Sequence, residues 1–75
     1  MATAFVLINV EIGAEEEVLR DLEPIPEVKE AYLVYGVYDI ITLVETETMQ
    51  ELKDAVSLKI RRLDKVHSTL TMIVV

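Results

Sequence analysis

Residues 28–45 read VKEAYLVYGVYDIITLVE, and this stretch decides the fold. Two segments rich in β-branched and aromatic residues flank a single glycine, and such flanks predict two strands joined by a short turn. We therefore expect a β-hairpin with strands over residues 28–35 and 38–45 and a tight connection at Gly36 and Val37. The segments before and after this hairpin then determine how it is built into a sheet.

One strand and one short helix are predicted before the hairpin. Residues 5–12 alternate with period two and are rich in β-branched side chains, which is typical of a strand. Gly13 permits a sharp turn, and the glutamates at 15–17 favour a helix N-terminus, where unpaired N–H groups present positive potential. Pro24 and Pro26 forbid continuation, so this helix ends before them.

A longer helix and a final strand are predicted after the hairpin. Thr48 and Glu51 have the spacing of a capping box, in which each side chain accepts an N–H group at the helix start. An amphipathic helix should follow, because apolar residues recur every three or four positions. They are Met49, Leu52, Val56, Ile60 and Leu63. Residues 67–75 alternate again and predict a last strand.

The resulting βαββαβ order is typical of an α+β, ferredoxin-like sandwich in a single domain of residues 1–75. Its four-stranded antiparallel sheet would carry both helices on one face. We expect the covered face to hold Val6, Ile8, Val10, Ile41, Leu43, Leu70, Met72 and Val74. The open face would then hold Phe5, Leu7, Asn9, Ile40, Thr42, Val44, Thr69, Thr71 and Ile73. Because this second set is too apolar to remain in water, we expect dimerisation through the open face; a half-exposed sheet is the alternative.

Composition supports an oligomer and argues against several partners. A chain of 75 residues has a thin stability margin, and without cysteine it can form no disulfide. The net charge of −7 would repel nucleic acid. The apolar run near the N-terminus has neither the basic leader of a signal peptide nor the length of a membrane span, and a cytoplasmic location is the default.

No catalytic centre, metal site or cofactor is predicted. His67 is the one side chain that titrates near neutrality without special help, and no partner for it is evident. The glutamates at 15–17 cannot converge on a cation, since consecutive helical residues diverge by about 100°. Tyr32, Tyr35 and Tyr38 are expected in core or rim packing rather than in one aromatic box.

The segment Tyr35-Gly36-Val37-Tyr38-Asp39 is the one candidate binding site. A glycine turn can point backbone N–H groups outward as a seat for an anion, and Asp39 lies close enough to accept from a cation. A zwitterion such as an amino acid needs both halves. The structural alternative, in which glycine makes the turn and the aspartate caps its backbone, explains the same spacing.

These residues resemble a known family. The stretches PEVKEAY at 26–32, YGVYDII at 35–41 and VHSTLTMIV at 66–74, together with the helix at 49–66, look like the effector-sensing RAM module (regulation of amino-acid metabolism) of leucine-responsive, Lrp/AsnC-type transcription regulators. The family's regulators carry an N-terminal helix-turn-helix, whereas here the first strand starts within five residues of Met1. DNA binding is therefore not carried over, and the chain resembles a stand-alone sensing module.

The resemblance implies that two chains pair through their open sheet faces and that the dimers associate further, often into rings, with amino-acid effectors between them. It further implies that Gly36, Val37 and Tyr38 offer turn backbone to the effector carboxylate. Asp39 would take the ammonium group, and Thr69 and Thr71 would line the pocket. Full-length regulators of the family would be partners for co-assembly.

Two other readings remain at this point. One is a dimeric α+β barrel enzyme such as a small monooxygenase, which needs a polar, titrating interior between the sheets. The other is a purely architectural, oligomeric subunit without a ligand. The leading interpretation is a non-enzymatic module that binds a small molecule, expected to be an amino acid, at a subunit boundary.

Overall fold

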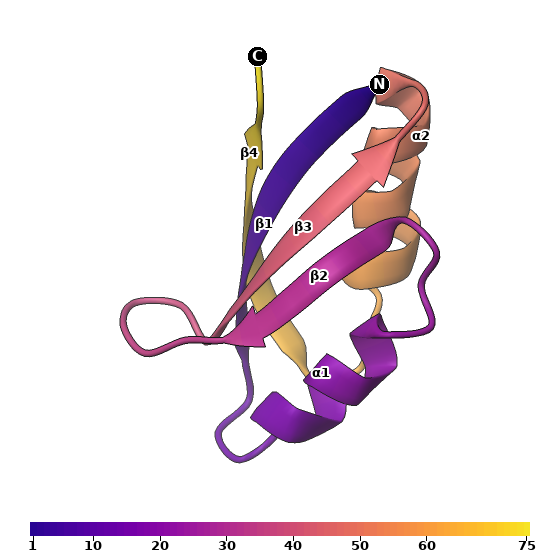
Figure 1. Cartoon of the computed structure of the whole chain (residues 1–75). Coiled ribbons are helices and arrows are strands. Elements are labelled where there is room, and N and C mark those ends of the chain that lie inside the picture. The colour runs from indigo at the N-terminus through magenta and orange to yellow at the C-terminus, as the bar shows by residue number, and fades with distance from the viewer.

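A computed structural model describes residues 1–75, and its elements follow the predicted βαββαβ order (Figure 1). In chain order they are β1 (Ala2–Val10), α1 (Glu15–Leu22), β2 (Val28–Leu33), β3 (Ile40–Thr46), α2 (Met49–Asp54), the π-helix η1 (Ala55–Ile60) and β4 (Val66–Ile73). The predicted α+β sandwich is confirmed. Strand limits differ from the expected ones by a few residues, and β1 begins three residues earlier than the sequence pattern indicated.

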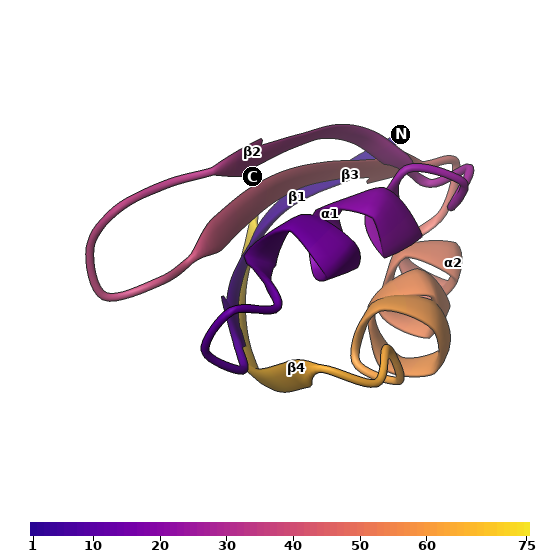
Figure 2. The same ribbon diagram turned by 90° about the horizontal axis from the view of Figure 1, so that it is seen from below.

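The four strands form one antiparallel sheet in the order β2-β3-β1-β4. Strand β1 is therefore central, with β3 on one side and β4 on the other. Both helices lie on the same side of the sheet, which curves around them (Figure 2). The other face of the sheet has no helical cover.

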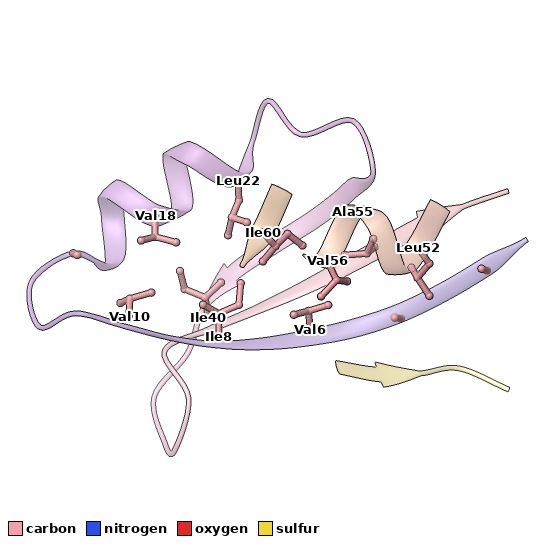
Figure 3. Close-up of a cluster of buried hydrophobic side chains, with 14 residues drawn as sticks. Val6, Ile8, Val10, Val18, Leu22, Ile40, Leu52, Ala55, Val56 and Ile60 are labelled. Atoms are coloured by element: carbon pink, nitrogen blue, oxygen red, sulfur yellow. The ribbon is translucent and has the colours of Figure 1, made fainter. Parts of the chain in front are cut away.

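The core lies between this covered face and the helices. Figure 3 shows side chains of α1, α2 and η1 pointing toward those of β1 and β3. Each of these five elements contributes a fully buried large side chain, and these include Ile8, Leu22, Ile40, Leu52 and Ile60. One buried polar side chain, Thr42, joins them because its hydroxyl donates to the backbone oxygen of Val6 over 3.0 Å.

The predicted faces of β1 are confirmed, whereas those of β3 and β4 are wrong. On β3 the buried residues are Ile40, Thr42 and Val44, and not Ile41 and Leu43. Residues paired across antiparallel strands share a face. The register of β4 with Ala4, Val6 and Ile8 therefore places Ile73, Thr71 and Thr69 on the helix side, and Leu70 and Met72 on the open side. Val74, expected under helical cover, is half exposed.

The error arises because both faces of these two strands are largely apolar, so alternation does not distinguish them. Alternation predicts Thr42 on the open face together with Ile40 and Val44, but all three are buried, and the Thr42 hydroxyl donates to the Val6 oxygen. Strand β4 is an edge strand whose residues are mostly exposed on both faces. The corrected open face holds Phe5, Leu7, Ile41, Leu43, Leu70 and Met72, and it is more apolar than predicted.

The helices begin where the sequence indicates. Gly13 has a φ of 85°, and the three glutamates occupy the first turn of α1. The predicted capping box is present, with the Glu51 N–H donating to the Thr48 hydroxyl and the Thr48 N–H donating to the Glu51 carboxylate. The expected single helix is instead α2 continued by η1. The Arg61 N–H there donates to the Val56 oxygen five residues back, over 2.9 Å.

The predicted tight turn at Gly36 and Val37 is wrong. Strand β2 ends at Leu33 and β3 begins at Ile40, and the six residues between them form an open loop that projects from the sheet (Figure 1). A hydrogen bond of 2.9 Å from the Val34 N–H to the Asp39 oxygen closes the base of this loop. We call residues 34–39 the β2–β3 loop.

One ion pair ties the start of β2 to η1. Both Glu27 carboxylate oxygens accept from Lys59 Nζ at 2.9 Å, and this contact lowers the pKa of Glu27 below its usual value of 4.5. A carboxyl group whose pKa is lowered by folding stabilises the folded state above its unfolded pKa and loses that contribution as the pH falls. Because both side chains remain partly exposed, the contribution is small.

We predict that Lys59→Gln lowers the free energy of unfolding by about 0.2–1 kcal/mol at pH 7. The difference from the wild type should be complete above pH 4.5 and shrink as the pH falls below it, because Glu27 is then protonated first in the unfolded state and finally in both states. Urea unfolding at several pH values measures it. Arg62→Gln is the matched control, since Arg62 forms no ion pair. A loss that is independent of pH would contradict this account.

Candidate functional site

Four backbone N–H groups of the β2–β3 loop have no partner: that of Tyr35 and those of the three residues predicted to bind a carboxylate. Those of Gly36, Val37 and Tyr38 lie outside the strands and donate to no acceptor within the chain. Gly36 has a φ of 144°, a conformation that residues with a side chain rarely adopt, although space for a Cβ is open there. The loop is thus shaped by its glycine and leaves amides available to an anion.

Asp39 is fixed at the base of this loop by hydrogen bonds to β1. Its N–H donates to the Ile8 oxygen over 3.0 Å, and its Oδ2 accepts from the Val10 N–H over 2.9 Å. The carboxylate therefore has a structural role, but toward the end of β1 and not toward its own turn as the structural alternative supposed. The second oxygen, Oδ1, accepts no hydrogen bond within the chain.

Asp39 also lines a pocket of about 390 Å³ between the β2–β3 loop and the start of α1. The lining residues are Glu15, Glu16, Leu33, Val34, Tyr35 and Asp39. Three of the six are carboxylates and none is a cation, so the pocket favours a positively charged group. Its apolar part comes from Leu33, Val34 and Tyr35.

Glu15 and Glu16 were missed as pocket residues by the sequence analysis. They were interpreted as a solvated helical turn, which accounts for their position at the start of α1. The strand order brings that turn to the loop, because α1 follows β1 directly and β1 pairs with β3. The two glutamates cannot act together as ligands of one cation, but both still make the cavity negatively charged.

The other predicted site residues do not line this pocket in one chain. Val37 is 85% exposed and Gly36 is exposed beside it, whereas Tyr38 is half-buried but does not line the pocket either. Thr69 and Thr71 are on β4, which is separated from β3 by β1, since Ile8 pairs with Thr69 on one side and with Ile40 on the other. Thr71 instead lines a second pocket, beside α2 and η1.

The remaining charged cluster lies at the surface. Glu11 Oε2 is 3.5 Å from Lys65 Nζ and raises the pKa of Lys65, and Glu11 Oε1 is 3.9 Å from Nε2 of His67. All three side chains are substantially exposed. No three His, Cys, Asp or Glu side chains are grouped to hold a metal ion. No helix is long and apolar enough to cross a bilayer.

A one-sided α+β sheet with a loop pocket defines a ligand-binding domain. Comparison with known proteins identifies its family: residues 3–75 match the Lrp/AsnC ligand binding domain, and the chain belongs to that family. The resemblance found in the sequence is therefore confirmed. This domain is a ligand-sensing module of transcription regulators and not an enzyme, so the barrel-enzyme reading is excluded.

Three similar proteins show how this chain compares with members of the family. The chain is 41% identical over 58 residues to regulatory protein AsnC of Haemophilus influenzae, covering 77% of this chain and 39% of that protein. It is 37% identical over 71 residues to the HTH-type transcriptional regulator FL11 of Pyrococcus horikoshii, covering 95% of this chain and 46% of that one. It thus spans less than half the length of these regulators. The crystal structure of FFRP-DM1 is 47% identical, with a TM-score of 0.96 and complete coverage of both chains.

We predict that Asp39→Ala lowers the free energy of unfolding by about 1–3 kcal/mol, because the Val10 N–H loses a charged acceptor. Asp39→Asn keeps an acceptor oxygen at the same place and should cost less than half as much. Urea unfolding of both variants measures the difference. Equal losses in the two variants would show that the hydrogen bond to Val10 is not what holds Asp39.

Proposed function

We propose that the chain senses an amino acid, held against the β2–β3 loop, and that it works as a dimer formed through the open sheet face. The observation that supports a ligand is the presence, in one loop, of backbone amides without acceptors and of a carboxylate with one oxygen that accepts no hydrogen bond. The N–H groups of Gly36, Val37 and Tyr38 have no partner, and Oδ1 of Asp39 accepts nothing within the chain.

These groups match the two charged ends of a zwitterion. The three amides would donate to the ligand carboxylate, and Asp39 would accept from its ammonium group. Glu15 and Glu16 add negative potential beside Asp39, while Leu33 and Tyr35 offer apolar surface to a side chain. The family match supports a ligand at such a module but does not name the ligand.

A second copy is expected to complete the site. Gly36 and Val37 are open to solvent in one chain, and the amides alone do not enclose a ligand. Thr69 and Thr71 are distant from the loop within one chain, so any role for them toward the same ligand requires another subunit. We therefore place the ligand between subunits, where binding would bias assembly.

The open face supports the dimer. Leu70 and Met72 are 44% and 45% exposed, and Phe5, Leu7, Ile41 and Leu43 share their side of the sheet. A contiguous apolar face of this kind is typical of an interaction surface. At its margins lie polar pairs, in which Asn9 donates to the Ser68 hydroxyl and the Tyr32 hydroxyl donates to the Glu30 carboxylate.

Co-assembly with full-length regulators is the regulatory part of this proposal. The relatives that contain the matched domain are transcription regulators of about twice the length or more. A subunit that shares their ligand-binding domain could enter their assemblies through the same open face. An architectural subunit without a ligand is the competing outcome, and the ligand experiment separates the two.

Calorimetry against the twenty amino acids tests the ligand. We expect at least one to bind the wild type and Asp39→Asn to weaken that binding by about tenfold or more, since a charged acceptor becomes neutral. Asp21→Asn is the matched control, because Asp21 lies on α1 but does not line the pocket. Heat from no amino acid, or equal binding by both variants, would refute the proposed site.

Sedimentation of two neighbouring variants tests the dimer. Leu70→Asp places a charge on the open face and should yield monomers at micromolar concentration. Thr71→Asp places the same charge on the same strand but on the helix side, and the dimer should persist. A monomeric wild type, or equal behaviour of the two variants, would show that the open face is not the interface.

A further inference from the structure

A second cavity, of about 250 Å³, lies between β4 and the helix formed by α2 and η1. Two of its lining residues, Thr71 and Ile73, pair with the buried Val6 and Ala4 of β1, so it is on the helix-covered side of the sheet. Its lining is Leu52, Lys53, Val56, Ser57, Arg61, Thr71 and Ile73, and we call it the β4 groove. It shares no residue with the pocket at the β2–β3 loop.

The β4 groove is basic in an acidic protein. The chain has fourteen carboxylates and seven Lys and Arg residues, yet the groove contains two cations and no carboxylate. Neither Lys53 nor Arg61 lies within 4.0 Å of an acidic group, whereas Lys59 and Lys65 are both paired. Two cations that no carboxylate neutralises are available to an anion.

The π-helix accounts for the alignment of these side chains. Lys53, Ser57 and Arg61 are spaced by four, and in an α-helix each step of four overshoots a full turn by about 40°. The i→i+5 hydrogen bond between Val56 and Arg61 widens the turn and reduces this drift. All three side chains therefore reach the same groove. Such π segments are frequent at functional sites.

The remaining lining residues restrict the anion further. The hydroxyls of Ser57 and Thr71 make no hydrogen bond within the chain. Ile73 supplies exposed apolar surface, and the buried Leu52 and Val56 close the groove from below. The volume is below that of pockets for drug-sized ligands, which begin at about 300 Å³. Without a carboxylate the groove has no negative charge to pair with an ammonium group, and its two cations repel one.

We propose that the β4 groove binds a short aliphatic 2-oxo acid. Arg61 and Lys53 would hold its carboxylate, and Ser57 and Thr71 would donate to its 2-oxo oxygen. Its aliphatic chain would lie on the exposed Ile73, above the buried Leu52 and Val56. This site differs in charge from the loop pocket, which suits a ligand with an ammonium group. It also stays accessible in the proposed dimer, because Thr71 and Ile73 face away from the open side of the sheet.

Amide NMR of the ¹⁵N-labelled chain tests the proposal, with 4-methyl-2-oxopentanoate as the probe. We expect shifts at Ser57, Arg61 and Thr71 and a weakening of about tenfold or more in Arg61→Gln, because a charged donor is lost. Arg62→Gln is the matched control, since its neighbouring cation does not line the groove. Asp39→Asn should leave these shifts unchanged, which separates this site from the loop.

Three results would overturn the proposal. The first is no shift at these amides, and the second is equal weakening by Arg61→Gln and Arg62→Gln. The third is equal binding of inorganic phosphate or L-leucine at the same amides, which would show an unspecific anion site or a groove that tolerates ammonium. Unchanged spectra of the free variants, apart from the substituted position, establish that each remains folded.

Discussion

Burial of one face of β1 under both helices is the contact on which the rest of this structure depends. Ala4, Val6 and Ile8 are fully buried, and β1 is the strand that pairs with both β3 and β4. In a domain of this size, only the covered face can provide a core. Each further element is placed by that face, since the helices pack on it and the neighbouring strands take their register from it.

The same constraint accounts for the uncovered face. Two helices cover one side of a four-stranded sheet, and the alternation of β1 then sends Phe5 and Leu7 to the opposite side. Their neighbours across the strands are Leu43, Met72, Ile41 and Leu70. A small chain that exposes such a surface gains more by pairing than by any internal rearrangement, because its own helices are already used. The core and the proposed interface therefore follow from one pattern on one strand.

Much of this architecture can be predicted from the sequence, and the failures have physical causes. Element order, the acidic start of α1 and the capping box at Thr48 depend on local signals that no distant contact overrides. The faces of β3 could not be predicted, because Thr42 looks polar and is satisfied only by the Val6 oxygen, 36 residues away. The sequence around Gly36 suggested a tight turn. The structure has a longer loop because the Asp39 carboxylate accepts from the Val10 N–H at the end of β1, a contact that the local sequence does not reveal. The prediction of the candidate site was incomplete for the same reason. Glu15 and Glu16 lie beside the loop only because β1 pairs with β3, and the local sequence does not show that pairing.

The net charge of this molecule does not predict the charge around a small bound ligand. Exposed charges are screened beyond about 8–10 Å at physiological ionic strength, so a bound group responds to the few side chains around it. The loop pocket collects Glu15, Glu16 and Asp39, whereas the β4 groove collects Lys53 and Arg61. The first arrangement arises from strand order and the second from a local widening of one helix. A chain with a net charge of −7 can therefore offer both an acidic and a basic site, and the fold, not the composition, decides where each one lies.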